Sequence, residues 1–187
     1  RPRLRRLLAG SLLVIPILLL FAPLFRLVPS GRGSSWAGWD ELAERAEHWE
    51  EILDVEDGIE GNLFFFAADY KDAAQLGHSL KLLWHAGGEH EKIRGTTDRG
   101  EPTLAQNVVG ENALQFDHWE DPRHRLGQDA ILVLPRPDQR HVMLEKTRLC
   151  FRAIEKVESV TVRRLGIEVL DADIYVCRGY RGPLARE

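Results

Sequence analysis

The residues best suited to chemistry lie in the segment Ala113–Pro122, where aromatic, carboxylate and imidazole side chains alternate before a proline. Asp117 can accept hydrogen bonds from hydroxyl groups, and the apolar faces of Trp119 can stack on a sugar ring. One interpretation is therefore a loop that presents Asp117, His118 and Trp119 to a polar ligand such as a sugar. The other is a capped turn in which Phe116 and Trp119 anchor the loop in the core, and the sequence alone favours this second interpretation.

Two other groups of residues could bind a metal or form a disulfide. His85, Glu89 and His90 lie at a Gly-rich polar loop with no fourth ligand nearby, which favours a solvated loop over a metal site. Cys150 and Cys177 are the two cysteines of the chain and form no C-x-x-C pair. They could form a disulfide in an oxidising compartment, but the pattern favours two small core residues. The sequence therefore predicts no metal and no cofactor.

The sequence motifs of several large enzyme classes are absent from the chain. It contains no G-x-S-x-G elbow, no H-E-x-x-H pair and no Gly-rich phosphate loop. A secreted hydrolase that uses Asp117, His118 or Glu120 is the least favoured function, because acids in a loop make a mechanism only when their geometry is suitable.

The stretch Leu7–Phe25 holds 19 residues without a charged side chain. As a helix it would be roughly 28 Å long, close to the ~30 Å hydrocarbon core of a bilayer. Four arginines precede it and the first acidic residue is Asp40, so the N-terminus is expected in the cytoplasm and the residues after about 30 outside the inner membrane. One alternative is a cleaved signal peptide, although its apolar region is usually about 7–15 residues and no A-x-A-like site follows. Another is the last span of a larger membrane protein.

The charge of the chain is unevenly distributed. Residues 1–28 contain five arginines and no acidic residue, so the formal charge of −4 for the whole chain leaves −9 for the rest. An acidic domain is poorly suited to binding nucleic acid, and the predicted partner is the lipid bilayer. The predicted organisation is a basic flank and membrane span over 1–29, a linker over 30–37, one extracytoplasmic α/β domain over 38–182 and a tail over 183–187.

Hydrophobic periodicity predicts an α/β domain in which helices cover a mixed sheet of roughly five strands. The first predicted helix, Gly38–Leu53, has an apolar stripe and an acidic outer face, which favours packing against its own domain. Trp36 and Trp39 could instead anchor at the membrane interface. The other predicted elements are a strand over 62–67, a helix from an N-cap at Asp69 to about Gly87, strands over 103–108 and 129–134, a helix from Asp138 to about 149 or 151, and a hairpin over 157–177.

Six short patterns occur in an order that is similar to one known family. They are Gly38-Trp39-x-x-Leu42, Phe65-Phe66-Ala67-Ala68-x-Tyr70, Ala105-Gln106-Asn107, Gln115-Phe116-Asp117-x-Trp119, Gly127-x-Asp129-Ala130 and Tyr175-x-Cys177-Arg178-x-Tyr180-x-Gly182. Together, over about Trp36 to Gly182, they resemble the C-terminal soluble region of bacterial GT-C glycosyltransferases. These are multi-spanning enzymes akin to dolichyl-phosphate-mannose protein mannosyltransferases and aminoarabinose lipid A transferases.

The resemblance implies a parent enzyme that moves a sugar from a polyprenyl-phosphate donor to a lipid or protein acceptor outside the cytoplasm. The active site of such enzymes is built from acidic residues in loops between early spans, so no catalytic residue carries over and this chain alone would be inactive. Leu7–Phe25 would then be the last span. The candidate substrate-facing residues are Gln115, Asp117, His118 and Trp119. The alternative function is a single-span membrane protein whose extracytoplasmic α/β domain binds a ligand or a partner.

Overall fold

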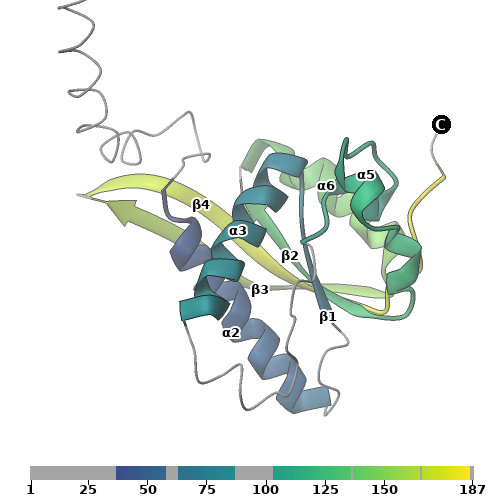
Figure 1. Cartoon of the computed structure of the whole chain (residues 1–187), viewed down its shortest axis with the longest axis horizontal. Coiled ribbons are helices and arrows are strands. Elements are labelled where there is room, and N and C mark those ends of the chain that lie inside the picture. The colour runs from purple at the N-terminus through teal and green to yellow at the C-terminus, as the bar shows by residue number, and fades with distance from the viewer. Residues whose placement is uncertain (1–36, 58–62, 87–102, 136, 165, 186–187) are drawn as a thin grey trace, which may run out of the picture.

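The computed structural model describes residues 37–57, 63–86, 103–135, 137–164 and 166–185, without the side chains of 54–57, 86 and 137–140. These residues form a four-stranded sheet in the order β1-β2-β4-β3 (Figure 1). Its strands are β1 (Leu63–Ala67), β2 (Asp129–Pro135), β3 (Ala153–Arg164) and β4 (Ile167–Arg178). β1 pairs with β2 in parallel, and β4 runs antiparallel to both of its neighbours. The predicted mixed α/β sheet and C-terminal hairpin are confirmed, with four strands in the described part instead of about five.

Helices cover both faces of the sheet. Helices α2 (Trp39–Asp57) and α3 (Tyr70–Ala86) pack on the face that carries Phe65. Helix α6 (Pro137–Cys150) and the 3-10 helix η1 (Gln106–Val109) pack on the face that carries Phe64 and Phe66. Neighbouring side chains of a strand point to opposite faces. Covering both faces therefore explains why β1 is apolar at every position.

Helix α2 packs against its own domain, as its apolar stripe predicts. Trp39 is only 3 % exposed and belongs to the core, so the alternative that Trp39 anchors at the membrane interface is wrong. Trp36 lies outside the described residues. The polar side of the helix contacts the hairpin, because Arg45 forms an ion pair with Glu158 and the indole N–H of Trp49 donates to the other carboxylate oxygen of Glu158 at 2.9 Å.

The strand predicted over 103–108 is wrong in extent. Leu104 makes one isolated parallel bridge to Phe66 on the outer edge of β1, and the chain then turns into η1. The cause is Asn107, whose side-chain Oδ1 accepts a hydrogen bond from the backbone N–H of Ala105 at 3.1 Å. A side chain that takes a backbone donor in this way replaces the partner that a strand ladder would supply.

The start of α3 and the turn of the hairpin follow their sequence signals. Asp69 Oδ1 accepts hydrogen bonds from the N–H groups of Lys71 and Asp72 at 2.8 and 3.0 Å, which confirms the predicted N-cap. Helix α6 begins at Pro137, where a missing N–H costs nothing. Gly166 adopts a φ of +80° between β3 and β4, a conformation that glycine takes without steric cost.

An aromatic cluster fills the core beneath α6. Phe151 lies 4.9 Å from Tyr180 and 5.7 Å from Phe66, measured between ring centroids. The buried hydroxyl of Tyr180 donates to the carbonyl of Val108 at 2.6 Å, and burial raises the pKa of Tyr180. The C-terminal segment is thereby fastened to η1.

Both cysteines are buried free thiols, which confirms the interpretation as core residues. Burial raises the pKa of both Cys150 and Cys177.

No helix among the described residues is long and apolar enough to cross a bilayer. The predicted span Leu7–Phe25 lies outside these residues, as do the basic flank and most of the linker.

Candidate functional site at helix α5

The segment that carries the candidate site residues folds as a short platform beside the start of α3. We call residues Asn112–Trp119 the α5 platform, after the four-residue helix α5 (Phe116–Trp119) that it contains. Phe116 is buried in a small cluster that joins the end of β1, the start of α3 and the segment before η1, with Tyr70 packed against its side. The platform thus lies near the carboxyl end of β1, the edge of an α/β sheet where ligands usually bind.

A buried asparagine fixes the platform to the domain. Asn107 is 1 % exposed, and its Nδ2 donates to the carbonyl of Phe116 at 3.3 Å while its Oδ1 accepts from Ala105. Next to it, Gln106 Nε2 donates to the carbonyl of Asn112 at 3.0 Å. The side chains of two neighbouring residues of η1 therefore hold the first residue of the platform and the start of α5.

Asp117 serves the fold of the platform itself. Its Oδ2 accepts a hydrogen bond from the N–H of Ala113 at 3.1 Å, and its side chain is only partly exposed. This oxygen closes the turn that leads into α5. The predicted role of Asp117 in facing a ligand is therefore not open to Oδ2, because this oxygen is bound to the backbone of the platform.

The exposed surface of the platform is formed by Asn112, Leu114, Gln115, His118 and Trp119. Trp119 is 60 % exposed, and its ring lies 4.7 Å from the ring of Phe116 at an angle of 53°. Leu114 is 54 % exposed and has a φ of +55°, a conformation that costs a residue with a Cβ about 1–2 kcal/mol. The structure thus combines the two interpretations of this segment, because Phe116 anchors it while Trp119 and His118 face outwards.

The segment after the platform is held by an internal ion pair. Arg125 Nε donates to Glu120 Oε1 at 2.5 Å, and both side chains are largely buried. Asp121 Oδ1 accepts from the N–H of Arg123 at 2.9 Å and caps the 3-10 helix η2 (Pro122–Arg125). Glu120 therefore stabilises the fold, and a hydrolase that uses it as an acid would have to break this pair.

The other patterns of the resemblance also contact one another. Asp129 accepts hydrogen bonds from Arg178 Nη1 and from the N–H of Gly179, both at 2.7 Å. The backbones of Gly127, Gln128 and Tyr180 exchange two further bonds at 2.8 Å. These residues join the start of β2 to the end of β4.

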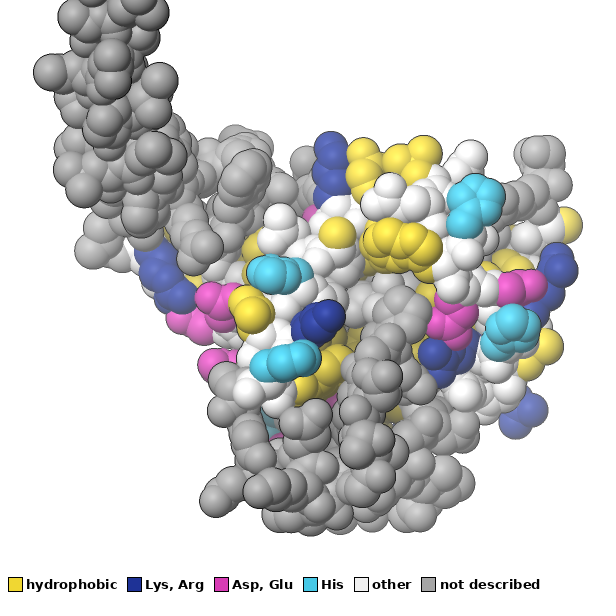
Figure 2. Space-filling view, in the orientation of Figure 1, with side chains coloured by type: hydrophobic (Ala, Val, Ile, Leu, Met, Phe, Trp, Pro, Cys, Tyr) yellow, Lys and Arg dark blue, Asp and Glu magenta, His cyan; other side chains and the backbone are white. Residues whose placement is uncertain are grey.

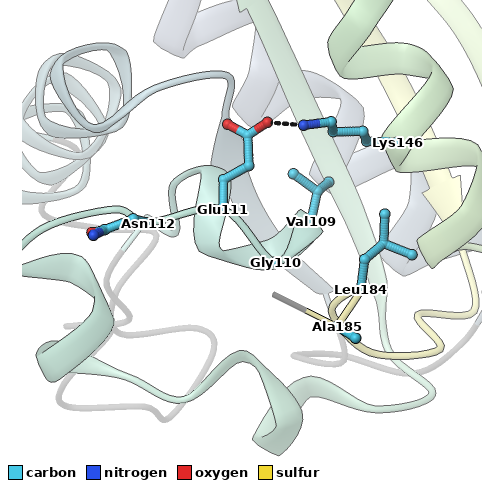
Figure 3. Close-up of a pocket in the computed structure, with 7 residues that line it drawn as sticks. All are labelled: Val109, Gly110, Glu111, Asn112, Lys146, Leu184 and Ala185. Atoms are coloured by element: carbon cyan, nitrogen blue, oxygen red, sulfur yellow. Dashed lines mark hydrogen bonds and ion pairs between the residues drawn. The ribbon is translucent and has the colours of Figure 1, made fainter. Parts of the chain in front are cut away.

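A pocket of about 570 Å³ lies behind η1. Figure 3 shows the ion pair between Glu111 and Lys146 across one side of it, with Leu184 facing it from the C-terminal segment. Its lining residues are Val109, Gly110, Glu111, Asn112, Lys146, Leu184 and Ala185. Gly110 is required there, because its φ is +86° and a Cβ would collide with the carbonyl of Leu184. Sequence reasoning missed this pocket, since its charged pair is formed by residues far apart in the chain.

Figure 2 shows basic, acidic and histidine side chains scattered over one face, without a large patch of a single sign. Among the described residues, no three His, Cys, Asp or Glu side chains lie close enough to hold a metal ion. The ring Nδ1–H of His85 donates to the carbonyl of Lys81 at 2.7 Å, while Glu89 and His90 lie outside the described residues.

No protein-family model, no curated protein and no solved structure matches this chain.

Proposed function

We propose that this chain is the C-terminal part of a membrane glycosyltransferase of the GT-C type. The parent enzyme would move a sugar from a polyprenyl-phosphate donor to a lipid or protein acceptor, using a carboxylate base in loops that this chain does not contain. The role proposed for the present domain is to contact the donor or the acceptor through the α5 platform.

One observation carries this proposal: the patterns that resemble the family are joined to one another in the folded domain. Asn107 of the third pattern holds Phe116 of the fourth. Asp129 of the fifth holds Arg178 of the sixth. Contacts between the patterns are what a shared fold requires. This supports a common architecture, and the role in glycosyl transfer is inferred from it.

The chemistry of the platform suits binding better than proton transfer. Asp117 is engaged with the backbone of Ala113 and Glu120 with Arg125, so these carboxylates already have structural partners. Trp119 offers an exposed aromatic face on a rigid base. Such a face can stack on a sugar ring or pack on an isoprenoid chain.

The first test reads the genomic DNA upstream of the codon for Arg1. The proposal expects an open reading frame that encodes further membrane spans and acidic loops. A stop codon and a start signal directly before Arg1 would overturn it.

The second test measures sugar transfer by the purified parent protein from a radiolabelled polyprenyl-phosphate sugar. Loss of one aromatic stacking contact in Trp119→Ala should raise the KM for the donor or the acceptor about 2–10-fold. The turnover number should change little, because Trp119 has no part in the bond-making step. The matched control is Leu82→Ala, which removes another large exposed apolar side chain, on α3. Equal KM values for Trp119→Ala and Leu82→Ala would show that the α5 platform does not contact the donor or the acceptor.

A second candidate function is favoured by the pocket behind η1. In a single-span protein, a cavity of about 570 Å³ that carries the Glu111–Lys146 pair could bind a small polar ligand. Calorimetric titration of the full chain in detergent with sugars and lipid head groups distinguishes the two functions. Saturable binding that Lys146→Ala abolishes, together with no transfer by any longer product of the gene, would favour this candidate.

A further inference from the structure

We propose that the chain forms a two-fold symmetric dimer in which strand β3 pairs with β3 of a second copy. The pairing segment is residues 158–164 of β3, which we call the edge segment. Pairing in antiparallel orientation joins the two sheets into one continuous sheet, with Thr161 of one copy opposite Thr161 of the other. The proposal goes beyond glycosyl transfer and does not depend on it.

The two edges of the sheet differ in the described part of the chain. At one edge, Leu104 lies beside β1: its carbonyl accepts from the N–H of Ala67 at 3.1 Å, and its N–H donates to the carbonyl of Phe65 at 2.9 Å. At the other edge, β3 pairs with β4 alone among the described strands. An edge of this kind presents a row of backbone donors and acceptors to which another strand can be added.

A bulge limits the pairing to the second half of β3. The first register shift leaves Val157 of β3 without an opposite residue on β4, next to Lys156. Bulges and lysine side chains are devices that protect a sheet edge from pairing. The second register shift places its extra residue, Val169, on β4 instead. Every residue of the edge segment therefore has a partner on β4, and β3 keeps the regular backbone of a ladder there.

The edge segment also lies where the sheet is narrowest. β2 pairs with β4 only over Ala172–Cys177, so the part of β4 opposite residues 161–164 has no other neighbour among the named strands. Figure 1 shows the β3–β4 hairpin reaching past the ends of β1 and β2. A two-stranded ribbon gains little stability from its own ladder. A second copy adds strands at this place.

Two antiparallel copies of the edge segment match in charge and in polarity on the face that α2 covers. With Thr161 on the two-fold axis, Glu158 lies opposite Arg164 of the second copy, and Val160 lies opposite Val162. Each pair occurs twice, because a two-fold interface uses the same surface of both copies. Cross-strand pairs of opposite charges or of apolar side chains contribute about 0.2–1 kcal/mol each.

Moving the axis by one residue in either direction removes this match. With Val160 on the axis, Lys156 would lie opposite Arg164 and Glu158 opposite Val162. With Val162 on the axis, Val160 would lie opposite Arg164, and Glu158 would lose its opposite charge. Like charges placed directly across a ladder are destabilising. The sequence of the edge segment therefore favours one register.

The two charged residues of the match can keep their partners within the domain. Glu158 forms an ion pair with Arg45 and accepts from Trp49 Nε1 at 2.9 Å, while Arg164 forms an ion pair with Glu41. The side chain of Arg164 is 36 % exposed. A carboxylate accepts, and a guanidinium donates, more hydrogen bonds than these. A bond from Arg164 of one copy to Glu158 of the other therefore adds to the existing pairs without breaking them.

The test is disulfide cross-linking of the full chain in mild detergent, where the native Cys150 and Cys177 are buried. Thr161→Cys should give a covalent dimer under mild oxidation, because directly opposite residues of an antiparallel pair have Cα atoms about 4.5–5.5 Å apart. Ser159→Cys is the matched control, since Ser159 is also exposed on β3. In the proposed dimer its two copies lie roughly 14 Å apart along the ladder, which is too far for a disulfide.

The dimer yield of Thr161→Cys should exceed that of Ser159→Cys several-fold. The double variant Ser159→Cys/Arg163→Cys should again give a covalent dimer, because these two positions lie opposite each other in the proposed register. Light scattering of the wild type, corrected for detergent, should give the protein mass of two chains.

Equal cross-linking of the two single variants would overturn the proposal, because random collisions would then explain it. So would a wild-type mass of one chain at the highest concentration measured. A thiol at position 161 that neither cross-links nor reacts with a maleimide would also overturn it, since another segment or another protein would then cover the edge segment. None of these outcomes depends on the tests of glycosyl transfer.

Discussion

Replacing Asn107 by alanine tests whether the α5 platform is held from within the core. In the wild type its amide group satisfies the N–H of Ala105 at 3.1 Å and the carbonyl of Phe116 at 3.3 Å. Alanine leaves both backbone groups buried without these partners, at a cost of about 1–3 kcal/mol for each group. The second bond is long, so we place the total loss of unfolding free energy at roughly 2–4 kcal/mol.

The neighbouring residue provides the matched control. Gln106 also donates one hydrogen bond to the platform, to the carbonyl of Asn112, but at an exposed site where water can replace it. Gln106→Ala should therefore cost only about 0.5–1 kcal/mol. Asn107→Asp should cost at least as much as Asn107→Ala at neutral pH, because it buries a carboxylate whose second oxygen faces the carbonyl oxygen of Phe116.

Urea unfolding of the full chain in mild detergent, followed by circular dichroism, measures these differences. Amide hydrogen exchange should locate the change at residues 113–119 in Asn107→Ala before the sheet opens. The reasoning is refuted if Asn107→Ala and Gln106→Ala lose equal stability, or if the platform amides exchange as slowly in both variants as in the wild type.

Three further predictions use the same unfolding assay. The free energy of unfolding of Leu114→Gly should stay within about 0.5 kcal/mol of the wild type, since relief of the positive φ offsets the lost side chain. Leu82→Gly, in a helix interior, should lose about 1 kcal/mol. Equal losses in the two variants would contradict the argument that the backbone of Leu114 is strained. Tyr180→Phe should lose about 1–2 kcal/mol, because the buried carbonyl of Val108 loses its donor, and an unchanged midpoint would contradict this. The free energy of unfolding should fall as the pH rises above about 8.5, the ordinary pKa of a thiol. Burial raises the pKa of Cys177 in the folded state, so the unfolded chain releases this proton first. The stability contributed by the Cys177 thiol is therefore complete below that pH and is lost at up to about 1.4 kcal/mol per pH unit above it. Cys177→Ala should show a shallower alkaline slope, and an identical slope would exclude this thiol as a source.

Local sequence signals predicted most of the fold. The apolar run at 63–67 predicted a buried strand. Asp69, two residues after this strand, predicted the start of α3. The alternation of apolar and polar residues at the C-terminal end predicted the β3–β4 hairpin. These features depend on residues close in sequence, so they can be recognised without knowledge of the packing.

The site was harder to predict because it depends on contacts between separate segments. Asn107 ends the expected strand by accepting a hydrogen bond from the N–H of Ala105. Its amide group also donates to the carbonyl of Phe116, nine residues away, and nothing in the local pattern signals this second bond. The positive φ of Leu114 also lacks a local signal, since glycine is the usual residue there. Of the two neighbouring aromatic side chains, Phe116 is buried and Trp119 is exposed, and the sequence alone does not distinguish them.

The position of β1 in the sheet has a consequence for how the protein is made. β1 pairs only with β2 among the named strands, and the face with Phe64 and Phe66 is closed by Phe151 and Tyr180. During synthesis, five consecutive apolar residues thus leave the ribosome long before their partners exist. The nascent chain exposes this apolar segment until Phe151 and Tyr180 are translated, so chaperones should engage it there, and a truncation before Tyr180 should send the product to aggregates or proteases.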